Sequence, residues 1–170
     1  MNRCKAFLTA LNDRGCGAAL IHRPENIRWL TGYTGEGCVF VSENAQVVVT
    51  DFRYVEQAGR QAPECDCRRT GNGVSESAVV RELCQAQGVK RLCVETDYLT
   101  HDEYLALEKA LEGVELIPLS ELPQELRLIK DAGEIESIQK AAAISCRAFD
   151  NLLGKIHPGM TEKQVQIMLD

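Results

Sequence analysis

Short apolar runs alternate with amphipathic segments over the first two thirds of the chain. Apolar runs of strand length cover 18–21, 39–41 and 47–49. Turn-forming residues separate the last two runs, which predicts an antiparallel hairpin. Six strands interspersed with helices predict an α/β domain built around a mixed sheet. The other expected strands are 65–69, 92–95 and 114–117, and the expected helices lie before Gly15, over 53–62, between Ser75 and Gly88, and between Thr100 and Gly113.

The pattern changes after residue 118. Pro123 and the mixed residues 124–127 predict a connector. Asp131 is then expected to cap a long helix, because the apolar residues that follow are three or four positions apart and share one face. Gly154 is expected to end that helix.

A last helix is expected at the end of the chain. Thr161 and Gln164 form a capping box, in which the hydroxyl and the amide reciprocally satisfy free backbone N–H groups. The apolar residues of this segment have no later element to pack on. The residues alone leave two explanations open: the helix docks on the preceding domain, or the chain is cut early in a second domain.

Composition narrows the class of protein. The 170 residues are 45% apolar and 26% charged, which is typical of one globular domain, or one domain and a fragment of another. A net charge of −6 argues against a nucleic-acid partner and against an anionic membrane surface. The sequence contains no apolar run of about 18 residues and no signal-peptide pattern, so we expect no membrane span and a cytoplasmic protein. Its eight cysteines are then expected to stay reduced.

Cysteine and histidine residues offer the first candidates for chemistry. Cys65 and Cys67 are two positions apart and would lie on one face of a strand. A zinc site usually needs a second ligand pair, and the sequence offers none at suitable spacing, so a structural role is favoured. His22, His101 and His157 are isolated in sequence, and we predict no metal site from them. A cysteine–histidine pair that meets only in space stays open.

A glycine-rich segment at 71–73 resembles a dinucleotide-binding loop only superficially. The third glycine of that motif is replaced by Glu76, whose carboxylate would repel a pyrophosphate at the helix N-terminus. From the residues alone, the sequence predicts an α/β domain without a self-contained active site.

Four segments, in order over nearly the whole chain, carry a family resemblance. They are Asn26-Ile27-Arg28-Trp29-Leu30-Thr31-Gly32-Tyr33-Thr34-Gly35, Val49-Thr50-Asp51-Phe52-Arg53-Tyr54-Val55-Glu56-Gln57-Ala58, Arg127-Leu128-Ile129-Lys130 followed by Glu134-Ile135 and Ala141, and Pro158-Gly159-Met160-Thr161-Glu162. Together they resemble the creatinase/prolidase/aminopeptidase P superfamily, specifically the amino-terminal domain of bacterial Xaa-Pro aminopeptidases and dipeptidases.

The resemblance implies a fold and a domain organisation. Residues 1–126 would form the creatinase/prolidase amino-terminal domain, with a mixed six-stranded, ribonuclease H-like sheet flanked by helices. Residues 127–170 would be the linker and first helices of a truncated metallopeptidase (pita-bread) domain. Of the two explanations for the last helix, the resemblance therefore favours the second, in which the chain is cut early in a second domain.

The resemblance also implies a parent activity. The parent enzyme would cleave Xaa-Pro bonds in proline-containing peptides with two divalent metals, typically manganese, and would be a homodimer. The two Asp, one His and two Glu ligands would all lie beyond this chain. This fragment is therefore expected to have no catalytic residue, no metal and no cofactor, and to be inactive alone. The alternative is a non-enzymatic peptide- or protein-binding module of the same superfamily.

Residues 33–37 are the expected rim of the substrate cleft. By resemblance, Tyr33 would offer stacking and Glu36 a counter-charge for a peptide amino terminus, while the glycines permit close backbone approach. An ordinary glycine-rich entry to the hairpin is the simpler alternative. Arg28 and Trp29 are expected at the rim, at an interface or in the core, and the residues do not decide among these places.

Asp51 and Arg53 are expected to have a structural role. They precede the helix expected over 53–62, and we expect them to cap and brace it rather than to contact a substrate.

Overall fold

The computed structural model describes residues 3–169, which form two compact units. The first unit ends at Arg127 and the second begins at Leu128. The first holds all the described strands, and the second is helical.

The first unit is built on one six-stranded sheet of order β4-β3-β2-β1-β5-β6. The central strands β1, β2 and β3 pair antiparallel, whereas β3–β4, β1–β5 and β5–β6 pair parallel. This confirms the mixed sheet and the predicted hairpin. The strands are β1 (Ala18–Ile21), β2 (Cys38–Ser42), β3 (Gln46–Thr50), β4 (Asp66–Arg69), β5 (Arg91–Val94) and β6 (Glu115–Pro118).

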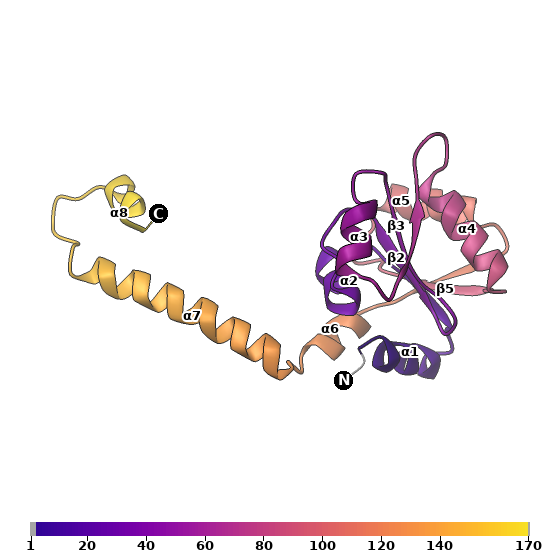
Figure 1. Cartoon of the computed structure of the whole chain (residues 1–170), viewed down its shortest axis with the longest axis horizontal. Helices are drawn as coiled ribbons and strands as arrows, with labels where there is room; N and C mark the ends of the chain where they lie inside the picture. The colour runs from indigo at the N-terminus through magenta and orange to yellow at the C-terminus, as the bar shows by residue number, and fades with distance from the viewer. Residues whose placement is uncertain (1–2, 170) are drawn as a thin grey trace. The chain divides into compact units, whose positions relative to one another are not determined.

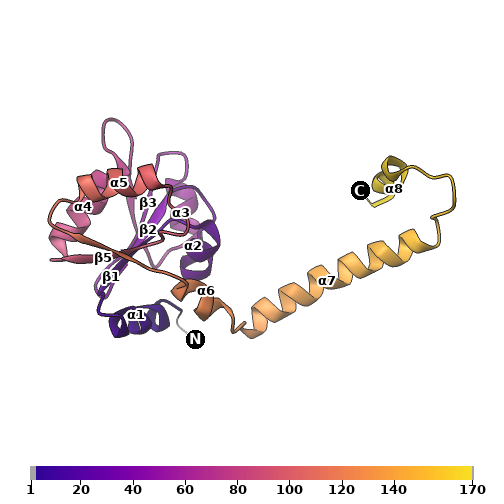
Figure 2. The same cartoon turned by 180° about the vertical axis from the view of Figure 1, so that it is seen from behind.

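Helices cover both faces of the sheet (Figure 1 and Figure 2). Helices α4 (Glu76–Ala86) and α5 (His101–Ala110) pack on one face, together with Leu20 and Phe40. On the other face, with Ile21 and Val39, lie α1 (Arg3–Asp13), α2 (Pro24–Thr31), α3 (Val55–Gln61) and α6 (Leu122–Arg127). Because both faces are covered, the central strands are continuous apolar runs rather than alternating ones.

Most predicted helix ends are confirmed by the hydrogen bonds that form there. The Ser75 hydroxyl accepts from the Ala78 N–H at 3.2 Å at the start of α4. Thr100 and Glu103 form the predicted capping box of α5, with the Thr100 N–H donating to the Glu103 carboxylate at 2.8 Å.

Two helices differ from the sequence prediction. The sequence predicts a connector over residues 124–127, but they belong to α6; Pro123 lies in the first turn of this helix, where a missing N–H costs nothing. Helix α2 was not predicted; it has eight residues, and at its Arg23 cap no described side chain accepts a hydrogen bond.

The second unit contains α7 (Ala132–Leu153) and α8 (Glu162–Leu169). Asp131 caps α7 as predicted and forms a capping box with Glu134, and the predicted capping box of Thr161 with Gln164 is present at α8. Gly154 follows α7 as its C-cap, as expected. Among the described residues of this unit, only Leu152 is buried.

Two further expectations concern membranes and thiols. Among the described residues, 3–169, we find no helix with the length and apolarity needed to cross a bilayer. All eight cysteines are free thiols. Five are buried, Cys65 and Cys67 are half-buried against the core, and Cys146 is exposed.

Candidate functional site

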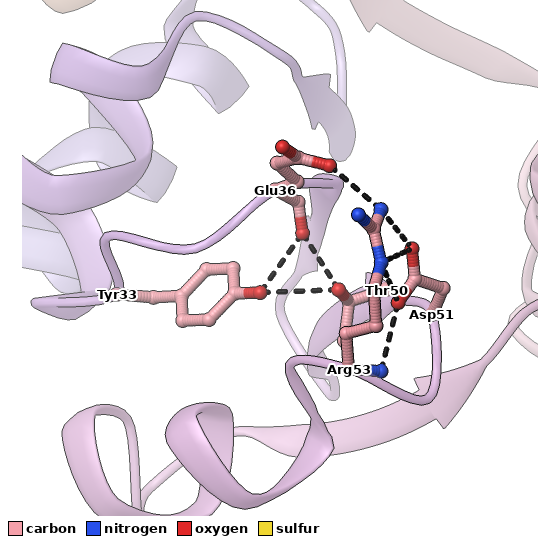
Figure 3. Close-up of polar contacts among 5 residues, drawn as sticks. All are labelled: Tyr33, Glu36, Thr50, Asp51 and Arg53. Carbon is pink, nitrogen blue, oxygen red and sulfur yellow. Dashed lines mark hydrogen bonds and ion pairs between the residues drawn. The ribbon is translucent and has the colours of Figure 1, made fainter.

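The loop between α2 and β2 is fastened by two hydroxyl groups (Figure 3). The backbone carbonyl of Glu36 accepts a hydrogen bond from the Tyr33 hydroxyl at 2.8 Å and from the Thr50 hydroxyl at 2.6 Å. The two hydroxyl oxygens are 3.1 Å apart. Thr50 is the last residue of β3, so the end of a central strand fixes the position of the loop.

An exposed ion-pair group lies beside this network. The Asp51 carboxylate accepts from the Arg53 backbone N–H at 2.8 Å and from the guanidinium Nη2 at 2.7 Å. The same Nη2 donates to the Glu36 carboxylate at 2.9 Å. Hydrogen bonds from Arg53 lower the pKa of Asp51, and Asp51 raises the pKa of Arg53. The Arg53 guanidinium therefore fixes the carboxylate of Glu36, although the Glu36 side chain is 67% exposed.

Asp51 and Arg53 brace the chain differently from the prediction. The N-cap of α3 is Tyr54, and no described side chain accepts a capping hydrogen bond there. Asp51 instead closes the turn before the helix, through Arg53 and through its carbonyl, which accepts from the Tyr54 N–H at 3.2 Å. The bracing role is present, but the helix-capping role is wrong, because α3 begins two residues later than expected.

Glycine is required at two positions of the loop. A Cβ on Gly35 would overlap the Tyr33 hydroxyl, and a Cβ on Gly37 would overlap the backbone carbonyl of Val49. Gly37 also has φ of 122°, which disfavours other residues. The glycines thus allow the loop to lie directly on the buried tyrosine and on β3.

The predicted rim residues lie in different environments. Arg28 is exposed on α2, and Glu36 is exposed in the loop. Trp29 is 7% exposed and belongs to the core, which decides between the alternatives left open for it. Tyr33 is fully buried, so its ring offers no face for stacking on a ligand, and that expectation is wrong. Its hydroxyl supports the loop from below.

A second buried network joins the first and third family segments. Glu95, 1% exposed, accepts hydrogen bonds from the His22 and Arg23 backbone N–H groups at 2.6 and 2.7 Å. The Asn26 amide donates to the same carboxylate at 2.5 Å. The Asn26 side-chain oxygen in turn accepts from Arg127 at 2.8 Å. The last residue of the first unit is therefore connected to the sheet through a fully buried asparagine.

Sequence reasoning missed a third group, formed by His22, Cys38 and Glu76. One possible ligand atom from each lies within 4.8 Å of the other two. Although burial acts to raise it, the pKa of Glu76 is lowered by hydrogen bonds from His22 and Cys38. Burial, together with Glu76, raises the pKa of the Cys38 thiol well above its ordinary value. The residues are 16 and 38 positions apart in sequence, so no spacing motif could reveal them; the register of β1 on β2 brings His22 opposite Cys38, and Glu76 comes from α4.

This group does not fit the two-metal centre that the family resemblance implies. That centre needs several carboxylates, whereas the candidate group among the described residues has one carboxylate, one imidazole and one thiol. The described residues therefore provide no pair of metal sites for peptide hydrolysis.

The fold and the loop network define the class of this protein. The model of the Creatinase/Prolidase N-terminal domain matches residues 3–129, so the chain belongs to that family. This confirms the resemblance carried by the four sequence segments.

Individual relatives are described as peptidases, and some of them as Xaa-Pro peptidases. The chain is 32% identical over 149 residues to the uncharacterized peptidase YqhT of Bacillus subtilis, covering 87% of this chain and 42% of the relative. An Xaa-Pro dipeptidase structure from Bacillus anthracis matches with a TM-score of 0.92 and 32% identity, over 98% of this chain and 46% of that one. The N-terminal domain of the cytoplasmic peptidase PepQ from Mycobacterium tuberculosis matches with a TM-score of 0.66 and 32% identity, over 74% of this chain and 98% of that domain. The chain spans less than half the length of the curated relatives it matches.

Proposed function

We propose that this chain is the non-catalytic amino-terminal part of a metal-dependent peptidase that cleaves Xaa-Pro bonds. The observation that carries the proposal is the similarity to the Bacillus anthracis Xaa-Pro dipeptidase, which covers 98% of this chain and so includes residues of both units. The catalytic metals, which we expect to be manganese, would be held by sequence outside this chain, because the described residues fit no two-metal centre.

The contribution proposed for this chain is to the rim of the substrate cleft. Glu36 presents an exposed carboxylate whose position is set by Arg53, and Arg53 is itself held by Asp51. A fixed carboxylate attracts the charged amino terminus of a peptide at lower entropic cost than a free one. Arg28, exposed on α2, is proposed for the rim or for the interface of a homodimer.

A chimera tests this function. In it, the chain replaces the matching amino-terminal part of the Bacillus anthracis dipeptidase. We expect manganese-dependent cleavage of Xaa-Pro dipeptides by the chimera and none by this chain alone. Turnover by the chain alone that co-purifies with it and is abolished by a chelator would contradict the proposal. A folded, metal-loaded chimera that cleaves no Xaa-Pro peptide would contradict it too, and would favour a peptide-binding module.

The rim assignment has its own measurement in the same chimera. Glu36→Gln is expected to raise KM about two- to fivefold with little change in kcat, because an exposed ion pair contributes up to about 1 kcal/mol. The matched control is Glu43→Gln, which removes an exposed carboxylate in the β2–β3 turn. Equal KM values for Glu36→Gln and Glu43→Gln would contradict the assignment of Glu36 to the rim.

A further inference from the structure

The register of β1 on β2 brings a histidine and a cysteine together. In the β1–β2 pair, Ile21 lies opposite Val39, so the next residues along, His22 and Cys38, are opposite each other. Alternation along the strands turns both toward the face that carries Leu20 and Phe40. Glu76, the first residue of α4, reaches the same place from the helix that covers this face.

The three side chains lie close together; two of them are largely withdrawn from solvent, whereas the Glu76 side chain is 38% exposed. His22 Nε2 and Glu76 Oε1 are 2.9 Å apart, and the Cys38 sulfur lies within 4.8 Å of a ligand atom of each. Cys38 is fully buried, and the His22 side chain is 14% exposed. The other ring nitrogen of His22, Nδ1, is buried and has no hydrogen-bond partner among the residues that the structure describes. Hydrogen bonds within the fold therefore satisfy only one side of the imidazole.

A pocket of about 320 Å³ adjoins the group. Its lining is acidic and apolar, and lysine and arginine are absent from the described residues that form it; they are His22, Ser75, Glu76, Ser77, Leu99, Glu103, Ala106 and Leu107. Such a pocket favours a cation. The helix dipole at the start of α4 explains why one carboxylate is stable there, but it does not explain why a thiol and an imidazole converge on it.

We infer that His22, Cys38 and Glu76 form a three-ligand binding site for Zn²⁺, with the fourth coordination position open to the pocket. Imidazole, thiolate and carboxylate are the ligand types that zinc takes in proteins, and a thiol among them disfavours magnesium, calcium and manganese. Three protein ligands and one exchangeable position are typical of zinc sites that are open to solvent or substrate.

The geometry requires only small side-chain movements. Zinc bonds of about 2.0–2.3 Å in a tetrahedral arrangement place ligand atoms about 3.3–3.8 Å apart. The histidine and carboxylate atoms are already closer than this, and all three atoms lie within 4.8 Å. On binding, the Cys38 thiol would lose its proton to solvent, because the thiolate is the metal ligand.

Cobalt substitution provides a direct test with the complete, tag-free chain. After treatment with a chelator, Co²⁺ is added anaerobically and the thiolate-to-cobalt charge-transfer band is recorded. We expect the band to saturate at a single equivalent of cobalt and to disappear when Zn²⁺ is added. The Zn²⁺ affinity then follows from competition with a chromophoric chelator. The absence of any thiolate band would overturn the inference.

Variants separate this site from the other thiols. His22→Gln and Glu76→Gln are each expected to weaken Zn²⁺ binding more than about tenfold, since even outer-shell changes cost about 10–100-fold. Cys38→Ser should abolish the cobalt–thiolate band. Cys84→Ser, in the same core cluster, is the matched control and should bind as the unmodified chain does.

Near-ultraviolet circular dichroism establishes which metal-free variants keep their fold. If Cys38→Ser unfolds, the zinc affinities of His22→Gln and Glu76→Gln test the proposed site instead. Unchanged zinc affinity in a folded His22→Gln variant would disprove the site. An equal loss in Cys84→Ser would disprove it as well, because the metal would then depend on the core in general.

Discussion

The two units of the molecule bury their apolar residues to very different degrees. In the first unit, Leu20 and Phe40 are fully buried between the sheet and its helices. In the second, Ile138 and Phe149 lie on one helix and are 55% and 58% exposed. Each unit nevertheless contains a helix that begins with a complete capping box, α5 at Thr100 and α7 at Asp131. The comparison separates helices specified mainly by local signals from helices held by a tertiary core.

The exposed face of α7 is also informative. Its apolar residues repeat at helical spacing, as they would on a helix that packs on another element. Within the described part of the second unit, only Leu152 is buried. Large exposed apolar faces mark surfaces that contact other protein segments. The face is consistent with the proposed place of this unit at the start of a larger catalytic domain.

Separating the two units should produce the largest difference, which we expect in how cooperatively each unit unfolds on heating. A chain of residues 3–127 is expected to unfold cooperatively on heating, because it retains the sheet and the buried residues on both of its faces. The matching N-terminal domain of PepQ has a crystal structure of its own. A peptide of residues 128–170 is expected to lose helix gradually, since isolated helices are marginal in water. Far-ultraviolet circular dichroism during heating measures both.

A sharp, concentration-independent melting transition of the 128–170 peptide would contradict the contrast drawn between the two units. Dilution is therefore part of the experiment, because association through the exposed face would make the transition depend on concentration.

Matched phenylalanine truncations give the next largest effect. Phe40→Ala is expected to lower the free energy of unfolding by about 3–5 kcal/mol, because it leaves a cavity in the core. Phe149→Ala should change it by less than about 0.5 kcal/mol, since the ring is already 58% exposed. Urea denaturation followed by tryptophan fluorescence reports on the first unit, where Trp29 lies. A comparable loss in both variants would mean that the second unit stabilises the first.

The smallest effect is expected from removing the surface charge of Arg53 in the first unit, which changes the titration of Asp51. Hydrogen bonds from Arg53 lower the pKa of Asp51 below its ordinary value of 3.8. The ion pair therefore stabilises the folded state above that ordinary value, and the contribution is lost as the pH falls through the lowered one. In Arg53→Gln, the pKa of Asp51 should rise toward 3.8, as measured by NMR titration of the side-chain carboxyl carbon. An unchanged Asp51 titration in this variant would contradict the assigned cause.

Much of the fold could be predicted because its signals are local. The apolar runs of β1, β2 and β3 and the caps at Ser75, Thr100 and Asp131 each lie within a few residues. Helix α2 has no capping side chain at Arg23, and its local signals are limited to Pro24 in the first turn and Gly32 at its end. Helix α6 is not evident from the sequence, because Pro123 indicates a break, although the first turn of a helix tolerates proline.

The candidate sites were less predictable, because they depend on which residues meet across the sheet. The loop could be located by its glycines, but the burial of Tyr33 follows from its contact with Thr50, which is 17 residues away. The pairing of His22 with Cys38 requires the register of two strands, and Glu76 reaches them from a helix beyond β4. Sequence spacing carries no such information.

The hydrogen bond between Arg127 and Asn26 has a mechanical consequence. Tension applied to the chain at Leu128 would reach Arg127, pass to Asn26, and load the Glu95 carboxylate just after β5. Strand β5 lies between β1 and β6, inside the sheet. A pull at this end would therefore load an interior strand as well as the edge strand β6, because the hydrogen bonds of Asn26 and Glu95 carry part of it.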